Sequence, residues 1–393
     1  MAELVDAHDS KSCGAIRESS ILSLGTTSSS TLLVLFVLCR KYDKILILKN
    51  VNQIMNFYTI FTVGYTIVSV ILIYLIYRDQ RRETLFFGKH KKLAWIIINT
   101  LAITSFLGLY VRFVEPFTIL TKETKIVIKE IKQPIKIAFI ADPQLNRFKN
   151  DSWAEKIDTK TIEAQPDIVI FGGDLVSNGG YFYEASSPNT SSGTEADWLN
   201  IFSKITEKYP SYYVLGNHEY GLGNTNLKNP DHWTGDQSKP VISVMEKIGT
   251  TSLNNHLFCF EIKNEKLCLF GIDDIWGAKV NLTKIDFSEL KNWNQKTPLI
   301  FITHNPDGIL QWPKDIKKPD LVLTGHTHGG QIYLPFIGPL GNAGIELGKQ
   351  YYRGLNYYEG IPIYTSIGLG ESGGPVRFMS APELTVITMV SSD

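Results

Sequence analysis

The feature that most constrains this chain is a pair of long uncharged stretches in its first third. Met55–Tyr77 has 23 residues and Leu93–Val111 has 19, and neither contains a charged side chain. About 20 apolar residues are enough for a helix to cross a bilayer. The alternative is a pair of buried core helices, which the length of both stretches and their lack of a polar face disfavour. The sequence therefore predicts two transmembrane helices within residues 55–116.

A short basic linker separates the two stretches and predicts their orientation. Its charged side chains are Arg78, Arg81, Arg82, Lys89, Lys91 and Lys92. Loops rich in Lys and Arg stay on the cytoplasmic side of a membrane. The second helix would then run outward, so that everything after about Phe117 lies outside the cytoplasmic membrane.

Residues 1–54 are predicted to be poorly structured and to precede the true start of translation. Their basic residues near the first stretch, Arg40, Lys41, Lys44 and Lys49, oppose the orientation derived from the linker. Codons for residues 8–13 and 18–23 can be chosen that pair into arms resembling the anticodon and T arms of a leucine tRNA. We therefore hypothesise that translation begins near Met55. A gene whose codons do not pair in this way would exclude the hypothesis.

Composition excludes one class of partner and leaves the redox compartment open. Lys+Arg and Asp+Glu are equal at 39 each, so no electrostatic reason exists to expect a nucleic-acid polymer as partner. The four cysteines form no CxxC motif. Cys259 and Cys268 flank an expected turn at residues 263–266. A disulfide could join them, but two unpaired core thiols are the favoured interpretation.

From residue 135 onward, short β-rich runs alternate with amphipathic segments. The expected strands are 136–141, 167–171, 211–215, 299–303 and 320–323, with a hairpin at 257–272 and a closing strand at 383–390. The expected helices are 153–164, 196–209, 240–248 and 306–311. This alternation predicts an α/β fold. Two stacked mixed sheets with helices outside, a four-layer α-β-β-α sandwich, would accommodate every element.

Polar side chains stand directly after the expected strands. Each of the following residues comes after a strand end: Asp142, Asp174, Asn217, His304, His326 and His328. The carboxyl ends of strands in open α/β sheets form the crevice where sites assemble. A single Asp or His there would be an ordinary cap or surface residue, but six in one order with flanking glycines are not explained by chance.

These residues stand in motifs that resemble those of the calcineurin-like metallophosphoesterase superfamily. The motifs are Asp142-Pro143-Gln144, Gly173-Asp174, Gly216-Asn217-His218-Glu219, His304 and Gly325-His326-Thr327-His328. The run that follows, 329–335, and the tail at 366–383 resemble its membrane-anchored bacterial branch. The resemblance spans roughly residues 134–390. It implies that 117–393 form a metallophosphoesterase domain behind the two membrane helices.

The resemblance also implies two metal sites that share one carboxylate. Metal one would take Asp142, Gln144, Asp174 and His328, and metal two would take Asp174, Asn217, His304 and His326. Mixed oxygen and nitrogen ligands suit Mn, Fe or Zn. Gln144 departs from the family, which most often has His there, so the affinity and identity of metal one are open.

The implied function is hydrolysis of a phosphomonoester or phosphodiester by a hydroxide held between two divalent metals. Asp174 and His218 would be the catalytic residues, with His218 either protonating the leaving oxygen or stabilising charge there, and with Glu219 orienting His218. The substrate would be a phosphate ester, either lipid-linked or a nucleotide. Two alternatives stay open: a non-hydrolytic metal-binding or regulatory protein, and a nucleotide pyrophosphatase. For Arg377, a structural ion pair is favoured over contact with a substrate phosphate.

Overall fold

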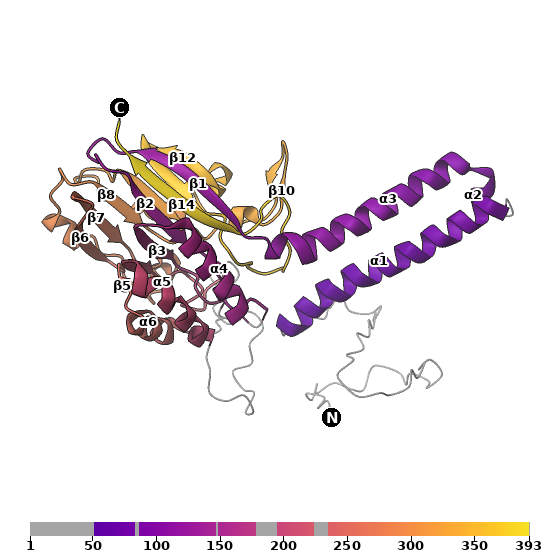
Figure 1. Ribbon diagram of the computed structural model, residues 1–393, viewed down its shortest axis with the longest axis horizontal. Coiled ribbons are helices and arrows are strands. Elements are labelled where there is room, and N and C mark those ends of the chain that lie inside the picture. The colour runs from indigo at the N-terminus through magenta and orange to yellow at the C-terminus, as the bar shows by residue number, and fades with distance from the viewer. Residues whose placement is uncertain (1–50, 83–85, 147, 178–194, 224–234, 393) are drawn as a thin grey trace, which may run out of the picture. The chain divides into compact units, whose positions relative to one another are not determined.

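The computed structural model describes residues 51–82, 86–146, 148–177, 195–223 and 235–392 (Figure 1). The predictions that residues 1–54 are poorly structured and that translation begins near Met55 concern a segment that lies almost wholly outside the described residues.

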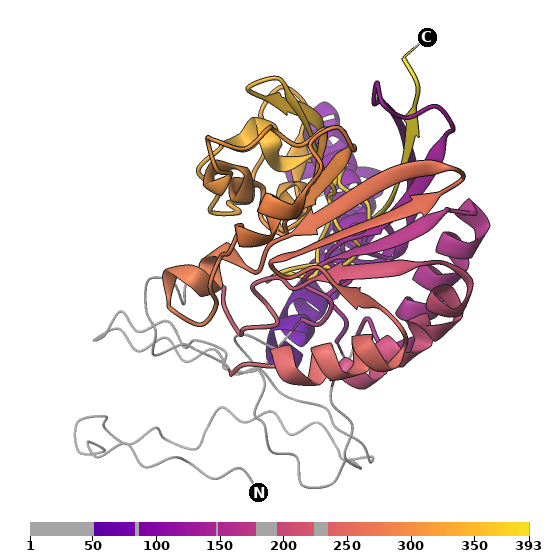
Figure 2. The same ribbon diagram turned by 90° about the vertical axis from the view of Figure 1, so that its left-hand side faces the viewer.

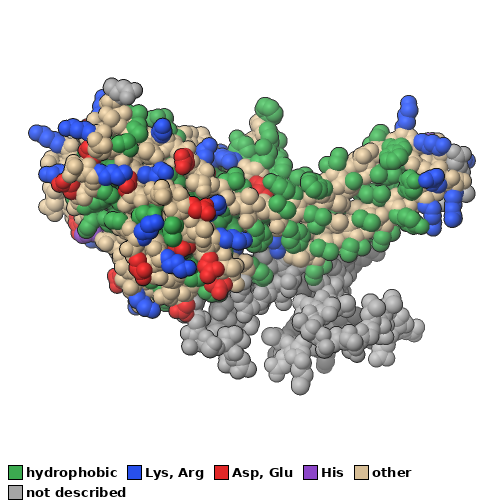
Figure 3. Space-filling view, in the orientation of Figure 1, with side chains coloured by type: hydrophobic (Ala, Val, Ile, Leu, Met, Phe, Trp, Pro, Cys, Tyr) green, Lys and Arg blue, Asp and Glu red, His purple; other side chains and the backbone are tan. Residues whose placement is uncertain are grey.

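The two uncharged stretches form long helices. These are α1 (Val51–Arg82) and α3 (Lys91–Leu109), joined through α2 (Phe86–Lys89). Within them, Phe57–Arg82 and Lys91–Phe117 are long and apolar enough to cross a membrane, with mean hydropathies of 2.2 and 1.8. Only 11% and 17% of the residues in their most apolar windows are buried. Hydrophobic side chains line both helices on the surface seen in Figure 3. This exposure argues against buried core helices, and both helices could be membrane anchors.

After α3 the chain enters the α/β part through a π-helical turn (Tyr110–Val114) and a 3-10 turn (Glu115–Phe117). The first six-stranded sheet has the order β1 (Leu120–Val127), β14 (Glu383–Val390), β2 (Ile135–Ile140), β3 (Ile168–Gly172), β4 (Ser211–Val214) and β5 (Thr251–Ser252). The second has the order β12 (Gly354–Tyr358), β13 (Ile361–Thr365), β9 (Leu321–Thr324), β8 (Leu299–Ile302), β7 (Glu265–Gly271) and β6 (His256–Ile262). A separate small hairpin pairs β10 (Tyr333–Leu334) with β11 (Gly338–Pro339).

Both large sheets are mixed, with parallel strands at their centres. In the first sheet β2, β3, β4 and β5 are parallel, and in the second β7, β8, β9 and β13 are parallel. The remaining helical segments are α4 (Asp151–Ala164), η3 (Glu195–Phe202), α5 (Ser203–Lys208), α6 (Ser238–Lys247), α7 (Ile275–Lys279), η5 (Ser288–Asn292), η6 (Pro306–Gln311), η7 (His328–Gly330) and η8 (Lys349–Tyr352). Figure 2 shows helices on the outer side of the strands.

The core consists of two kinds of apolar layer, as strand alternation requires. On β2, Ile137 and Phe139 pack with side chains from the second sheet, which places the two sheets face to face. Ala138 and Ile140 point the other way and pack with helix residues such as Trp153. The predicted α/β class with two mixed sheets and outer helices is confirmed.

The helices predicted at 196–209 and 306–311 are present, but residues 195–202 and 306–311 are 3-10 helices. The interpretation of the cysteines is wrong. Cys259 and Cys268 are joined by a disulfide and are not unpaired thiols. The reason is the turn between β6 and β7. It has only two residues, Lys263 and Asn264, both with positive φ, and this register sets the two cysteines directly opposite each other.

Candidate metal centre

The carboxyl ends of five parallel strands bring the predicted site residues together. Asp142 follows β2, Asp174 follows β3 and Asn217 follows β4 in the first sheet. His304 follows β8 in the second sheet, and His326 and His328 follow β9. With Gln144, all seven predicted ligand residues are buried. Their convergence matches the sequence prediction, while their role as metal ligands stays a prediction.

The backbone is held in an unfavourable conformation at most of these residues. Positive φ angles occur at Asp142 (51°), Gln144 (50°), Asp174 (51°), His326 (70°) and His328 (50°). The left-handed region costs a residue with a side chain roughly 1–2 kcal/mol. Such strain persists where the surrounding structure enforces it, and it gathers at functional sites. The loops therefore hold a preset arrangement of side chains.

Motif glycines allow the loops to approach one another closely. A Cβ atom at Gly216 would collide with Asp174 Oδ1, and a Cβ at Gly325 would collide with Asp142 Oδ2. At Gly173, a Cβ would lie 2.7 Å from Gly216 N and 2.8 Å from His304 Nδ1. The glycines in the Gly-Asp, Gly-Asn-His-Glu and Gly-His-Thr-His motifs thus serve close packing around the site residues.

Three acceptor atoms converge around Asn217, His304 and His326. His304 Nδ1–H donates to the carbonyl of Gly172 at 2.8 Å, and His326 Nε2–H donates to the carbonyl of Ala343 at 3.0 Å. These bonds leave His304 Nε2 and His326 Nδ1 as lone pairs, 3.3 Å apart. Asn217 Oδ1 lies 2.8 Å from the same Nδ1. When both imidazoles are neutral, no proton lies between these three acceptors, and a cation fits among them.

A second group forms around Asp142, Gln144 and His328. His328 Nδ1–H donates to the carbonyl of Gly370 at 2.9 Å, which turns Nε2 toward Asp142 Oδ1 at 3.6 Å. Gln144 Nε2 donates to Asp174 Oδ2 at 2.9 Å. Gln144 Oε1 and His328 Nε2 are both buried and have no hydrogen-bond partner among the described residues. Buried acceptors without a partner are costly, and a divalent cation would supply one for both.

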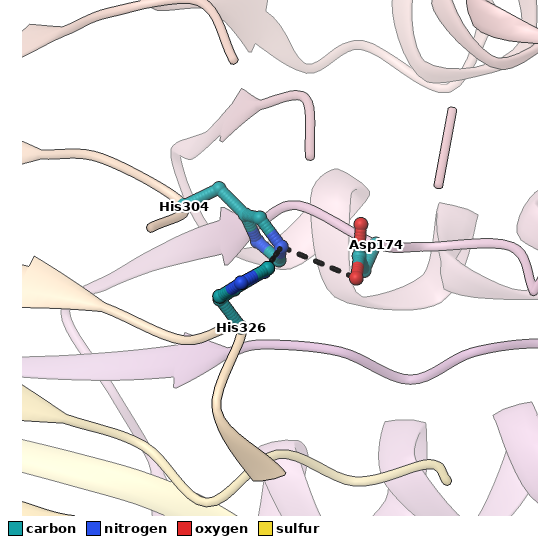
Figure 4. A group of neighbouring side chains, drawn as sticks. All are labelled: Asp174, His304 and His326. Carbon is teal, nitrogen blue, oxygen red and sulfur yellow. Dashed lines mark hydrogen bonds and ion pairs between the residues drawn. The ribbon is translucent and has the colours of Figure 1, made fainter. Parts of the chain in front are cut away.

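Asp174 belongs to both groups. Its carboxylate lies with His304 and His326 on one side and with Asp142 and His328 on the other, and the possible ligand atoms of each group are within 4.8 Å of one another. Figure 4 shows His304 directed at Asp174, with Nε2 3.2 Å from Oδ2, and His326 beside them. One carboxylate is therefore shared by two groups of possible metal ligands.

The buried charges of these side chains act strongly on one another. Burial works against ionisation of Asp174, but the imidazoles of His304 and His218 outweigh it and lower its pKa. Burial raises the pKa of Asp142 to about 7 and lowers that of His326 to about 3. For His304, Asp174 outweighs burial and raises the pKa to about 10. A divalent cation would stabilise both carboxylates in their ionised form and the imidazoles in their neutral form.

His218 lies at the edge of a pocket of about 220 Å³ above these groups. Its Nδ1–H donates to the carbonyl of Ser177 at 2.8 Å, so Nε2 faces Asp174 Oδ2 at 3.8 Å and Ser372 Oγ at 3.4 Å. Trp276 also lines the pocket and packs edge-on against His326, with ring centroids 4.6 Å apart. The sequence had given Trp276 no definite role.

Glu219 has a different role from the predicted one. Its carboxylate does not orient His218 but accepts hydrogen bonds from four backbone N–H groups, those of Asp174, Leu175, Val176 and Gly216. It therefore braces the loops after β3 and β4 against each other. No sequence signal marks this role, because its partners are main-chain atoms.

Arg377 is fully buried behind the site and is not a substrate contact. Its guanidinium pairs with Glu371 Oε1 at 3.1 Å, which confirms the predicted ion pair. It also donates to the carbonyls of Gly368 and Gly370. The Gly370 carbonyl is the one that holds His328 Nδ1, so Arg377 supports the position of that imidazole.

Comparisons with known proteins agree with this geometry. Residues 135–330 match the calcineurin-like phosphoesterase family. Phosphodiesterase YaeI of Escherichia coli (strain K12) is 29% identical over 296 residues, which cover 74% of this chain and 95% of the relative. Metallophosphoesterase YkuE of Bacillus subtilis (strain 168) is 28% identical over 290 residues, which cover 72% and 90%.

A solved structure, the Haemophilus influenzae NAD nucleotidase, aligns with 60% of this chain and 46% of its own at 15% identity and a TM-score of 0.36. The family match covers the whole set of site motifs from Asp142 to His328. Through this domain the chain belongs to the calcineurin-like phosphoesterases, which are metal-dependent hydrolases of phosphate esters.

Proposed function

We propose that the protein is a membrane-anchored phosphohydrolase with two divalent metals that share Asp174. In this proposal, residues 55–116 are the anchor and 117–393 the catalytic domain. Metal one is held by Asp142, Gln144, Asp174 and His328, and metal two by Asp174, Asn217, His304 and His326. The observation that carries the proposal is the convergence of two groups of possible ligand atoms that share one carboxylate, with two buried acceptors that have no partner among the described residues.

Gln144 fits the proposed site although the family most often has His there. Its Nε2 is fixed by Asp174, so Oε1 is free to face a cation together with His328 Nε2. An amide oxygen is a neutral ligand, and oxygen-rich sites suit Mn or Fe as well as Zn. This argues for the hydrolase over a non-hydrolytic binding protein, because the first site keeps a complete set of donors.

When bound, the two metals would acidify a water and offset negative charge on the phosphate. The protein supplies the rest. The strained loops fix the donors before a substrate arrives, and the buried walls exclude bulk water. His218 lines the pocket, and with both ring nitrogens protonated its Nε2 would donate a proton to the leaving oxygen.

The pocket supports a phosphate group as the part of the substrate that enters. Its volume of about 220 Å³ is below the range of sites that enclose a drug-sized ligand, so the remainder of an ester would lie outside. The similarity to a relative named as a phosphodiesterase supports phosphodiesters as well as monoesters. The substrate class is therefore a phosphate ester with a bulky group that the pocket does not enclose, either lipid-linked or nucleotide.

Metal removal tests this function. The full chain is used, in a mild detergent, because two hydrogen bonds join the α/β part to the segment just after α3. Ser380 N–H donates to Glu115 Oε1 at 2.6 Å, and Lys149 Nζ donates to the carbonyl of Pro116 at 2.8 Å. Stripping with a chelator is expected to lower hydrolysis of p-nitrophenyl phosphate and its bis ester by about 100-fold or more. Added Mn²⁺, Fe²⁺ or Zn²⁺ should restore it with two ions per chain. Inertness with every metal would support the non-hydrolytic alternative, and strong competition by nucleoside diphosphates would support a nucleotide pyrophosphatase.

We further propose that the catalytic domain lies outside the cytoplasm. The basic residues between the two uncharged stretches 55–77 and 93–111 support a cytoplasmic linker. The disulfide between Cys259 and Cys268 supports the same side, because disulfides persist in oxidising compartments and are rare in the cytosol.

Thiol labelling in intact cells tests the location. When Cys13 and Cys39 are replaced by serine, the two remaining cysteines are those of the disulfide. A maleimide is therefore expected to label almost none of the protein until the disulfide is reduced. The control is Cys268→Ser, which frees the exposed Cys259 and should be labelled at once. Labelling of the unreduced chain at the level of the control would place the domain in a reducing compartment.

A further inference from the structure

The hairpin of β10 and β11 carries an exposed apolar tip. We call residues 333–340 the apolar hairpin. At its tip Phe336 is fully exposed and Ile337 is 68% exposed, and at its base Leu340 is 50% exposed. Figure 1 shows the hairpin projecting from the sheets, and Figure 3 shows hydrophobic side chains gathered on it. Phe336 has a φ of 69°, an uncommon conformation for a bulky residue. A strained turn that presents phenylalanine to solvent calls for a partner.

The base of this hairpin is tied to the end of the second apolar helix. Tyr333 N–H donates to the carbonyl of Phe378 at 2.9 Å. The neighbouring Arg377 N–H donates to the carbonyl of Val111 at 3.1 Å. Val111 is the last residue of the uncharged stretch Leu93–Val111. Residues 377 and 378 therefore lie between the hairpin and the end of the uncharged stretch, and their backbone bonds to both.

The surroundings of the base have the composition of a membrane interface. The Arg353 guanidinium lies over the Tyr333 ring, 4.6 Å from its centroid. The exposed Lys349 donates from Nζ to the carbonyl of Pro339 at 2.9 Å. Tyrosine, lysine and arginine gather at the level of lipid headgroups, while phenylalanine and isoleucine reach the acyl boundary. The hairpin therefore has charged and aromatic side chains at its base and apolar ones at its tip. The same order is found in a bilayer, from the headgroups to the acyl chains.

We propose that the apolar hairpin inserts its tip into the outer surface of the bilayer that α1 and α3 cross. This inference rests on the membrane anchoring proposed above. Its partner is the lipid surface. The pocket wall includes Gln331 just before the hairpin and Asn342 and Ala343 just after it. Insertion of the tip therefore holds the mouth of the metal site beside the membrane, where phosphate esters embedded in the bilayer are within reach.

Quenching by brominated lipids measures the insertion directly. The full chain is reconstituted in phosphatidylcholine and phosphatidylglycerol vesicles with or without bromine on the acyl chains. Phe336→Trp adds a reporter at the tip. The matched control is Val127→Trp, at a 58% exposed position at the far end of β1, roughly 23 Å along the strand from its start after the helix. Trp95, which is 51% exposed on α3, reports on the proposed membrane span. Its contribution to the emission is the difference between the chain with Trp95 and the variant Trp95→Phe.

In brominated vesicles, the emission added by Phe336→Trp is expected to fall roughly twofold or more, with Trp95 quenched and the Val127→Trp reporter unchanged. Ile337→Trp repeats the measurement at the next position, and hydrolysis of p-nitrophenyl phosphate shows that each variant is folded. Quenching of Trp95 without quenching of either hairpin reporter would overturn the hairpin proposal and leave the anchoring intact. Failure of Trp95 quenching would instead overturn the anchoring. If the Phe336→Trp reporter is unquenched and is shielded from iodide only in native membranes, the hairpin binds a protein partner, which also overturns the proposal.

Discussion

Asp174→Asn is expected to reduce phosphoester hydrolysis by about 10³-fold or more, which corresponds to roughly 4 kcal/mol of transition-state stabilisation. Asp174 is the one residue that both groups of possible metal ligands share. The amide of asparagine has no negative charge and only one oxygen, whereas both carboxylate oxygens would be needed to hold two metals. Its NH₂ would also face His304 Nε2, now 3.2 Å from Oδ2, and Gln144 Nε2, now 2.9 Å away. Metal content should fall from two ions per chain to one or none.

The measurement is kcat/KM on p-nitrophenyl phosphate together with metal analysis of the purified full chain. Asp167→Asn is the matched control, since Asp167 stands just before the other end of β3 and its carboxylate accepts from Lys136 N and Lys263 Nζ, away from the site residues. The control should keep activity and metals. Full activity of Asp174→Asn with two bound ions would contradict the shared carboxylate and with it the two-metal assignment.

Much of the fold was predictable because its central strands are buried on both faces. The five strands that carry the site residues, β2, β3, β4, β8 and β9, are short runs of mostly apolar and aromatic residues, and a polar motif follows each. The edge strands were harder to predict from the sequence. β1 is largely exposed and alternates Lys, Glu and Thr with few apolar residues, so nothing in its sequence distinguishes it from a linker. Its strand character depends on pairing with β14, more than 260 residues away.

The side chains of the site were predictable, but the atoms that orient them were not. His304, His326 and His328 are each fixed by a main-chain carbonyl, those of Gly172, Ala343 and Gly370. A carbonyl exists at every residue, so a sequence contains no signal for which one serves. The disulfide was missed for a related reason. Whether Cys259 meets Cys268 depends on a turn of two residues, and a turn one residue longer would move the cysteines out of register.

Glu219→Ala is expected to lower the free energy of unfolding by about 3–5 kcal/mol, a large effect for a residue without a predicted structural role. Four backbone N–H groups now share its carboxylate, at 2.7 to 3.2 Å, and all are buried. Alanine would leave them without an acceptor beside a cavity. Because two of these groups belong to Asp174 and Gly216, the loops after β3 and β4 would also separate, and metal affinity should fall by roughly 10–100-fold.

Urea unfolding of the full chain in detergent, followed by tryptophan fluorescence, measures the stability change. Glu219→Gln is the matched variant, because it keeps the volume and one good acceptor oxygen but turns an NH₂ toward N–H groups. It should lie between the wild type and Glu219→Ala in both stability and metal affinity. Equal stability of all three chains would mean that water replaces the carboxylate without loss, and that Glu219 does not brace these loops. If the stability falls while metal affinity stays unchanged, the carboxylate stabilises the fold but the positions of Asp174 and Asn217 are set elsewhere.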